Sequence, residues 1–161
     1  MIHKLIILLT GVIILSCNQV ENSSQKLVEE PLSEPIFPKG QKIESDHFIG
    51  EVWLEMFIRD DTTLYTTMGN VTFEPGARTN WHSHPGGQIL MVTEGLGWYQ
   101  ERGKSKRKIR KGEVVTCQPN IQHWHGASDQ SMTHMAMSIN TQNGGAVWGE
   151  PVTDEEYMGD R

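Results

Sequence analysis

The chain predicts an all-β domain, and two observations support that prediction. From Phe48 onward, short runs rich in β-branched and aromatic residues are separated by glycines and by pairs such as Asp60-Asp61, which is typical of strands joined by tight turns. Before the C-terminal tail, no run shows helical periodicity over more than a turn or two. Many short strands of this kind indicate a sandwich or a closed barrel.

Length and charge narrow the class of protein further. The 161 residues are enough to bury a core in one domain of ordinary size. The formal net charge of −6 argues against nucleic acid as a partner. The two cysteines do not make a disulfide framework.

The first residues have the pattern of an export signal. Lys4 leads into the apolar run 5–15, which is too short to cross a bilayer comfortably. The run that ends at Cys17 resembles a bacterial lipobox, so we expect residues 1–16 to be a lipoprotein signal peptide and Cys17 to carry the lipid. The expected location is the cell envelope, with membrane contact through the lipid anchor only. An ordinary signal peptide or an uncleaved anchor is the alternative.

Residues 17–46 have the composition of a flexible tether. Prolines and glutamates lie among small polar residues, and such a segment cannot bury enough apolar surface to order itself. The alternative is that its last part adds an edge strand to the domain, through Ile43 or Phe48. The folded domain is expected to span residues 47–161.

Within that domain, strand-like runs follow one another with little else between them. The basic run 102–111 is expected to be a solvated hairpin, and a patch for anionic lipid or polysaccharide is the alternative. Cys117 is expected to be a small buried hydrophobe, not a nucleophile. The expected strands cover residues 49–57, 64–73, 88–93, 97–101 and 113–117.

Residues 132–138 alternate, with His134 on one face and methionines on the other. The methionine face is expected to pack in the core, and His134 is expected to face whatever the barrel encloses. A hydrogen-bonded structural histidine is the alternative for His134.

The stretch 81–88 carries the candidate chemistry. His82 and His84 are two residues apart, which in a strand places both imidazoles on one face. Gln88 follows a Pro-Gly-Gly turn that lets the backbone fold back toward the same place. The run 123–125, His-Trp-His, supplies a third candidate. Three imidazoles and an amide oxygen facing one cavity would hold a divalent first-row metal.

The spacing of these residues resembles two motifs of the cupin superfamily. Residues 76–95 are similar to the first motif, with Gln88 in the place usually held by glutamate. Residues 112–123 are similar to the second motif, but Asn120 stands where the pattern has glycine and the spacing is one residue off. Asparagine tolerates positive φ better than most residues, so the turn can survive.

A closer resemblance covers residues 47–157. It rests on segments 71–79, 95–98, 123–127, 132–134 and 152–157. These segments are similar to the small bacterial monocupins that include the manganese-dependent (R)-selective hydroxynitrile lyases. Many monocupins share residues of this kind without an assigned reaction, so fold and site are expected to carry over better than the reaction.

The resemblance implies a jelly-roll barrel, the double-stranded β-helix of cupins, with one metal site. It also implies Mn²⁺ as the metal, with Fe²⁺, Zn²⁺ and Ni²⁺ as alternatives. The implied metal ligands are His82, His84, Gln88 and His123, and the implied acid/base residues are His125 and His134.

The expected activity is a lyase reaction on a small molecule. All four implied ligands are neutral, so the metal would keep its double positive charge and act as a Lewis acid. This favours Lewis-acid chemistry over redox chemistry. The resemblance implies cleavage of a cyanohydrin such as mandelonitrile, with the natural substrate left open, and the same groups would serve enolisation, decarboxylation or lactone chemistry equally well. A metal-dependent cupin dioxygenase and a non-enzymatic cupin that binds a small ligand are the alternatives.

Arg78 and Thr79 are expected to orient substrate, or Arg78 to lie in a surface loop. A homodimer or homotetramer is the expected assembly if the chain is not a monomer.

Overall fold

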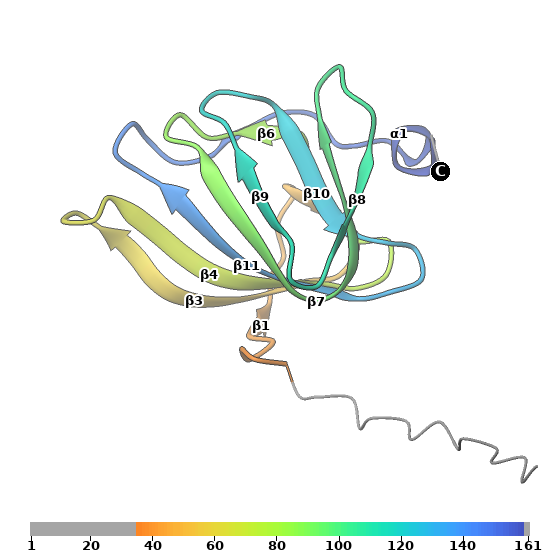
Figure 1. Cartoon of the computed structure of the whole chain (residues 1–161), viewed down its shortest axis with the longest axis horizontal. Helices are drawn as coiled ribbons and strands as arrows, with labels where there is room; N and C mark the ends of the chain where they lie inside the picture. Colours follow the sequence, from red (N-terminus) through yellow and green to blue (C-terminus); the bar gives the residue numbers. More distant parts are fainter. Residues whose placement is uncertain (1–34, 160–161) are drawn as a thin grey trace, which may run out of the picture. The chain divides into compact units, whose positions relative to one another are not determined.

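The computed structural model describes residues 35–159, so the predicted signal peptide, Cys17 and residues 17–34 of the predicted tether lie outside the described residues. The described strands form one curled antiparallel sheet (Figure 1). No helix in the described range is long and apolar enough to cross a membrane. The elements are β1 (Gln41–Lys42), β2 (Phe48–Ile49), β3 (Val52–Asp61), β4 (Thr66–Phe73), β5 (Arg78–Thr79), β6 (His82–Ser83), β7 (Gln88–Glu101), β8 (Arg107–Arg110), β9 (Val114–Cys117), β10 (His123–Ala127), β11 (Thr133–Asn140), β12 (Val147–Trp148) and α1 (Asp154–Met158).

The sheet folds over into two layers. The first layer contains β1, β3, β4, β11, the first half of β7, and β9. The second layer contains the second half of β7, with β8, β10, β5, β2, β6 and β12. Strands distant in the sequence, such as β4 and β11, lie side by side because the chain crosses repeatedly between layers (Figure 1). The prediction of an all-β jelly roll is confirmed.

Strand β7 joins the two layers, and Gly95 makes its bend. The φ of Gly95 is +81°, and a Cβ added there would lie 1.9 Å from the carbonyl oxygen of Met132. Only glycine meets both demands without strain. The sequence predicts separate strands over residues 88–93 and 97–101. They form one strand because Gly95 lets the chain bend without ending its pairing.

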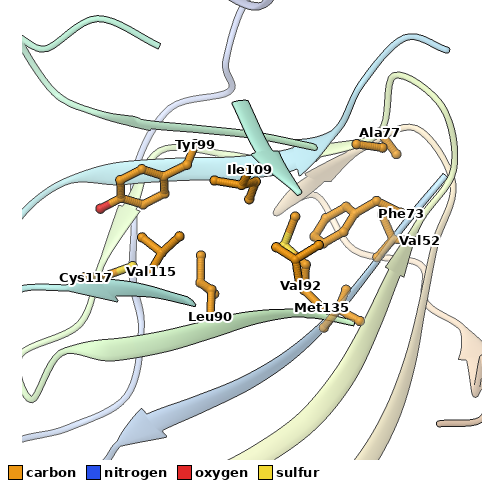
Figure 2. Packing of buried hydrophobic residues seen from close by; sticks show 12 residues of the cluster. Val52, Phe73, Ala77, Leu90, Val92, Tyr99, Ile109, Val115, Cys117 and Met135 are labelled. Carbon is orange, nitrogen blue, oxygen red and sulfur yellow. The ribbon is translucent and has the colours of Figure 1, made fainter. Parts of the chain in front are cut away.

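The main hydrophobic core fills the space between the layers (Figure 2). Side chains alternate along β7, so Leu90 and Val92 are buried while Ile89 is exposed. Tyr99 enters from the second layer. Cys117 is buried beside it, and burial raises the pKa of the thiol to about 12. The prediction that Cys117 is a buried small hydrophobe is confirmed.

A second buried cluster lies on the outer face of the second layer. Trp124 stands between His123 and His125 in β10, so its side chain points away from theirs. The cluster consists of Trp81, Trp98, Trp124, Val152 and Tyr157. Helix α1 begins at a capping box formed by Thr153 and Glu156, and the hydroxyl of Tyr157 donates to the carbonyl oxygen of Ala127 at 2.9 Å. The C-terminal segment is therefore held against the back of β10.

Residues 38–46 pack against the first layer. Gln41 and Lys42 pair with β3, and the amide of Asn70 donates to the carbonyl oxygen of Pro38 at 3.2 Å. Ile43 packs against the main core. The edge-strand alternative therefore describes this part of the predicted tether, because the end of the segment finds an unpaired edge of β3.

The basic run 102–111 contains β8 and the turn before it, as the hairpin interpretation predicts. Most of its cations lie close to acidic side chains, either near the hairpin or in the C-terminal segment. Lys111 lies 2.6 Å from Glu94, and Arg110 lies 3.8 Å from Glu113. The positive charge of this hairpin is therefore largely offset by its neighbours.

Candidate metal centre

His82 and His123 face each other across two paired strands. They are direct partners in the register of β6 and β10, and their ring centroids lie 4.3 Å apart. Both side chains are buried. The pairing brings together two segments that are distant in the sequence, as the predicted ligand set requires.

The hydrogen bonds of these two rings fix which nitrogen is free. His82 Nδ1 lies 3.0 Å from the carbonyl oxygen of Asn80, and His123 Nδ1 lies 2.9 Å from that of Ile121. A carbonyl oxygen only accepts, so both Nδ1 atoms donate. In a neutral ring, Nε2 then carries a lone pair, which is the arrangement of a metal-binding histidine.

Gln88 presents an oxygen to one of these lone pairs. Its Oε1 lies 3.0 Å from His123 Nε2, while its Nε2 donates to Met137 Sδ at 3.7 Å. Two acceptor atoms at this distance repel each other unless a proton or a cation satisfies both. A divalent cation bound by both atoms would remove the conflict, so these residues fit a metal.

His84 and His125 are buried histidines whose ring nitrogens have no hydrogen-bond partner among residues 35–159. A buried polar atom without a hydrogen bond costs about 1–3 kcal/mol, so each ring is suited to a partner that the protein alone does not provide. The backbone of His84 is fixed by bonds from the amides of Gly87 and Asn120. Asn120 has a φ of 62°, as expected for an asparagine in the glycine position of this turn.

The tightest group of ligand atoms differs from the predicted ligand set in one member. One ring nitrogen from each of His82, His123 and His125 lies within 4.8 Å of the other two. His84 is not in this group, and its ring centroid lies 5.1 Å from that of His82. His82 and His123 are common to both sets, which differ in whether His84 or His125 is the third histidine.

The electrostatics of the centre keep these histidines neutral. Burial, more than any other cause, lowers the pKa of His82, His84, His123 and His125. Repulsion from neighbouring histidines lowers the pKa of His82, His84 and His125 further. For His84 the pKa falls to about 4. Neutral imidazole is the form that binds a metal.

His134 does not join the centre, and the expectation that it faces the interior is wrong. Met135 lies in the main core, so alternation along β11 turns His134 to the outer face. There its Nδ1 is 2.9 Å from the hydroxyl of Thr72. The structural alternative therefore describes His134.

Arg78 and Thr79 lie on opposite faces of β5. Thr79 lines the pocket beside the histidines. Arg78 is buried on the other face and donates to the carbonyl oxygen of Val152 at 2.9 Å and to Asp154 at 2.6 Å. Arg78 is therefore neither a substrate-orienting residue nor a surface residue, because it anchors the C-terminal segment.

An apolar cavity of about 150 Å³ adjoins the histidines. Its polar wall includes His82, His84, Gln88 and His125. Its apolar walls include Phe48, Leu54, Met137 and Trp148. Trp148 was missed by sequence reasoning, because only the pairing of β12 with β6 places it here. A larger hollow of about 330 Å³ lies nearby, but it shares only Gln88 with the centre.

Comparison with known proteins agrees with this fold. A family model described as "Cupin domain" matches residues 69–139. A relative named (R)-mandelonitrile lyase, from Granulicella tundricola, is 42% identical over 114 residues, which cover 70% of this chain and 87% of that protein. Together with the two-layer β-fold, these matches show that the chain belongs to the cupin family. Within that family it is similar to the (R)-mandelonitrile lyase.

Two solved structures extend the comparison. A cupin-like protein from Thermotoga maritima is 51% identical, with a TM-score of 0.71 over 76% of this chain and 93% of that one. An oxalate oxidase in complex with glycolate is 25% identical, with a TM-score of 0.51 over 60% of this chain and 54% of that one. The neighbours therefore include cupins of more than one chemistry.

Proposed function

We propose that this protein is a metal-dependent lyase that cleaves a cyanohydrin, similar in activity to the relative named (R)-mandelonitrile lyase. One observation carries the proposal: the neutral rings of His82, His84 and His125 and the side-chain amide of Gln88 form one wall of an apolar cavity. Apolar cavities of about 150 Å³ are large enough to hold a benzene ring. The cavity therefore suits a small aromatic molecule whose polar group points at the histidines.

The proposed ligands are His82, His123 and Gln88, completed by His84 or His125. A divalent metal bound there would supply Lewis acidity, which lowers the pKa of a substrate hydroxyl. By resemblance, Mn²⁺ is the proposed metal.

His125 is the proposed base if His84 is the third ligand. Its ring is buried and burial lowers its pKa well below 6.5, so it is neutral and one ring nitrogen carries a lone pair that can take a proton. In the proposed reaction, His125 takes the hydroxyl proton, the carbonyl double bond forms, and the bond between the carbinol carbon and the nitrile carbon breaks. Cyanide leaves with the electron pair of that bond and recovers the proton from His125 as hydrogen cyanide.

The test of this function is direct. The protein is purified without chelators, its metal content is measured, and benzaldehyde release from (R)-mandelonitrile is followed. We expect release that tracks metal content across partially loaded samples. Release no faster than with the metal-free protein would overturn the proposal.

An oxygen-consuming cupin is the second candidate, and the likeness to an oxalate oxidase favours it. The neutral ligand set argues against it, because electron-rich ligands suit oxygen activation better. Oxygen uptake by the metal-loaded protein on small hydroxy acids or aromatic substrates would favour this candidate. Tight binding of a ring compound without turnover of any kind would favour a ligand-binding cupin.

For location, we propose a lipoprotein of the cell envelope, held by a lipid on Cys17. The support is the sequence pattern that ends at Cys17. A domain held in this way would meet its substrate outside the cytoplasm.

A further inference from the structure

Residues 141–149, here called the strap, contain β12 and border the pocket through Ala146 and Trp148. The amide of Thr141 donates to the carbonyl oxygen of Tyr65 at 2.8 Å, and the amide of Gly149 donates to that of Trp81 at 2.7 Å. Between these anchors lies Gly144, with a φ of +110°. The strap is thus fixed at both ends and carries Trp148 to the cavity wall.

The indole of Trp148 stands between the metal centre and an exposed ring. Its centroid lies 4.8 Å from that of His82 and 5.7 Å from that of Phe48. The exposed ring of His47 also stacks on the indole of Trp148, with ring centroids 4.4 Å apart and an interplanar angle of 3°. The ring is therefore held in one orientation by three neighbours, while it also forms part of the pocket surface.

The remaining walls make the cavity selective for uncharged ligands. Leu54, Met56 and Met137 provide apolar surface away from the strap. No Lys, Arg, Asp or Glu from the described residues lines this cavity. A carboxylate substrate would find no cationic side chain, whereas a neutral flat ring would find aromatic and thioether surface.

We propose that Trp148 is the specificity-determining residue of this pocket: its indole packs against the ring of the substrate and limits the size of ring that fits. The inference rests on the proposed function in taking an aryl cyanohydrin as the occupant. Trp148 acts on substrate choice and is not a metal ligand.

The experiment compares Trp148→Ala and Trp148→Phe with the wild-type protein. The control is Trp53→Ala, because Trp53 packs under Lys39 at 3.5 Å from Nζ to the ring centroid and does not line the cavity. Metal content is measured first. The value of kcat/KM is then measured for mandelonitrile and for the cyanohydrin of 2-naphthaldehyde, and the affinity for benzyl alcohol is measured by calorimetry on metal-loaded protein.

We expect Trp148→Ala to keep its metal and to lose about fivefold or more in kcat/KM for mandelonitrile, the size expected for one lost aromatic contact and its burial. The preference for the naphthyl over the phenyl substrate should rise about tenfold, because the wall has been removed. In Trp148→Phe, kcat/KM and the ring preference should lie between those of the wild-type protein and Trp148→Ala. Trp53→Ala should match the wild-type protein in both.

The outcomes separate this inference from the proposed function. If neither cyanohydrin is cleaved but Trp148→Ala weakens benzyl alcohol binding and Trp53→Ala does not, the lyase proposal fails and the role of Trp148 stands. An unchanged ring preference and an unchanged affinity for benzyl alcohol in Trp148→Ala overturn the inference. If Trp148→Ala loses metal, the indole supports His82, and the test passes to metal-loaded Trp148→Phe. An unchanged preference between the naphthyl and phenyl substrates in that variant overturns the inference.

Discussion

His82 and His123 are direct partners across β6 and β10, with ring centroids 4.3 Å apart and each Nδ1 bonded to a backbone carbonyl. This shared geometry leaves a lone pair on the Nε2 atom of each ring, and Gln88 Oε1 lies 3.0 Å from that of His123. A hydrogen bond at one ring nitrogen fixes the tautomer and so prepares the other nitrogen to bind.

Removal of either ring should therefore remove the metal. We expect His82→Ala and His123→Ala each to lose bound metal, by about tenfold or more in affinity, because each removes a direct ligand. Metal content after dialysis against a weak chelator measures this. The matched control is His134→Ala, which should keep both metal and activity because His134 lies on the outer face of β11. Loss of metal in the control would contradict this placement.

The roles of His84 and His125 can be separated by the same assay. If His84 is the third ligand and His125 the base, His84→Ala loses metal, whereas His125→Ala keeps it and loses turnover. The reverse pattern makes His125 the ligand, as the 4.8 Å grouping indicates. Full metal retention in both variants would exclude both assignments.

Gln88 tests the chemistry itself. A Gln88→Glu variant places a negative charge near His123 Nε2 with almost unchanged shape, so metal should bind at least as tightly. A bound hydroxyl should then be acidified less. One pKa unit corresponds to about 1.4 kcal/mol, so we expect cyanohydrin cleavage to slow by about tenfold or more. Rates are compared at equal metal content. Oxygen uptake that persists or rises in the variant would support the oxygen-consuming alternative, and unchanged cleavage would remove the case for Lewis-acid chemistry.

The buried histidines predict a pH-dependent stability of the metal-free protein. Burial lowers the pKa of His84 from 6.5 to about 4, so between these values the unfolded chain binds a proton that the folded chain does not. The free energy of unfolding should therefore fall as the pH drops below 6.5. The decrease is up to about 1.4 kcal/mol per pH unit for each histidine whose pKa is lowered in this way. Urea denaturation at pH 7 and at pH 5 measures this change in the free energy of unfolding. The change should be smaller in His84→Ala than in the wild-type protein, and an equal change in both proteins would refute the prediction.

The lipid anchor is tested by Cys17→Ser. The wild-type protein should partition with membranes, whereas the variant should be released or left unprocessed, because serine cannot carry the thioether-linked lipid. Fractionation and the mass of the mature protein measure the difference. If wild type and variant form the same soluble species, the lipoprotein proposal is wrong.

The sequence predicts the fold well because glycine-punctuated strands have few ways to bury their apolar faces. It also identifies His82 and His123, since spacing around a turn is a local property. It fails for His134, because alternation shows which residues share a face but not which face turns inward. In β11 the methionines fill the core, and His134 is left to bond Thr72. Trp148 could not be foreseen, since its place depends on the long-range pairing of β12 with β6.

The strands that build the metal centre have a consequence for how the protein matures. β6 finds its partners, β10 and β12, only after most of the chain has been synthesised. Such distant pairings form late, because the entropy of closing long loops must be overcome first. A partly made chain therefore has scattered histidines and no binding geometry. Since affinity alone favours copper and zinc over manganese, the identity of a metal bound at this centre would depend on which ions are available in the compartment where the last strand pairs.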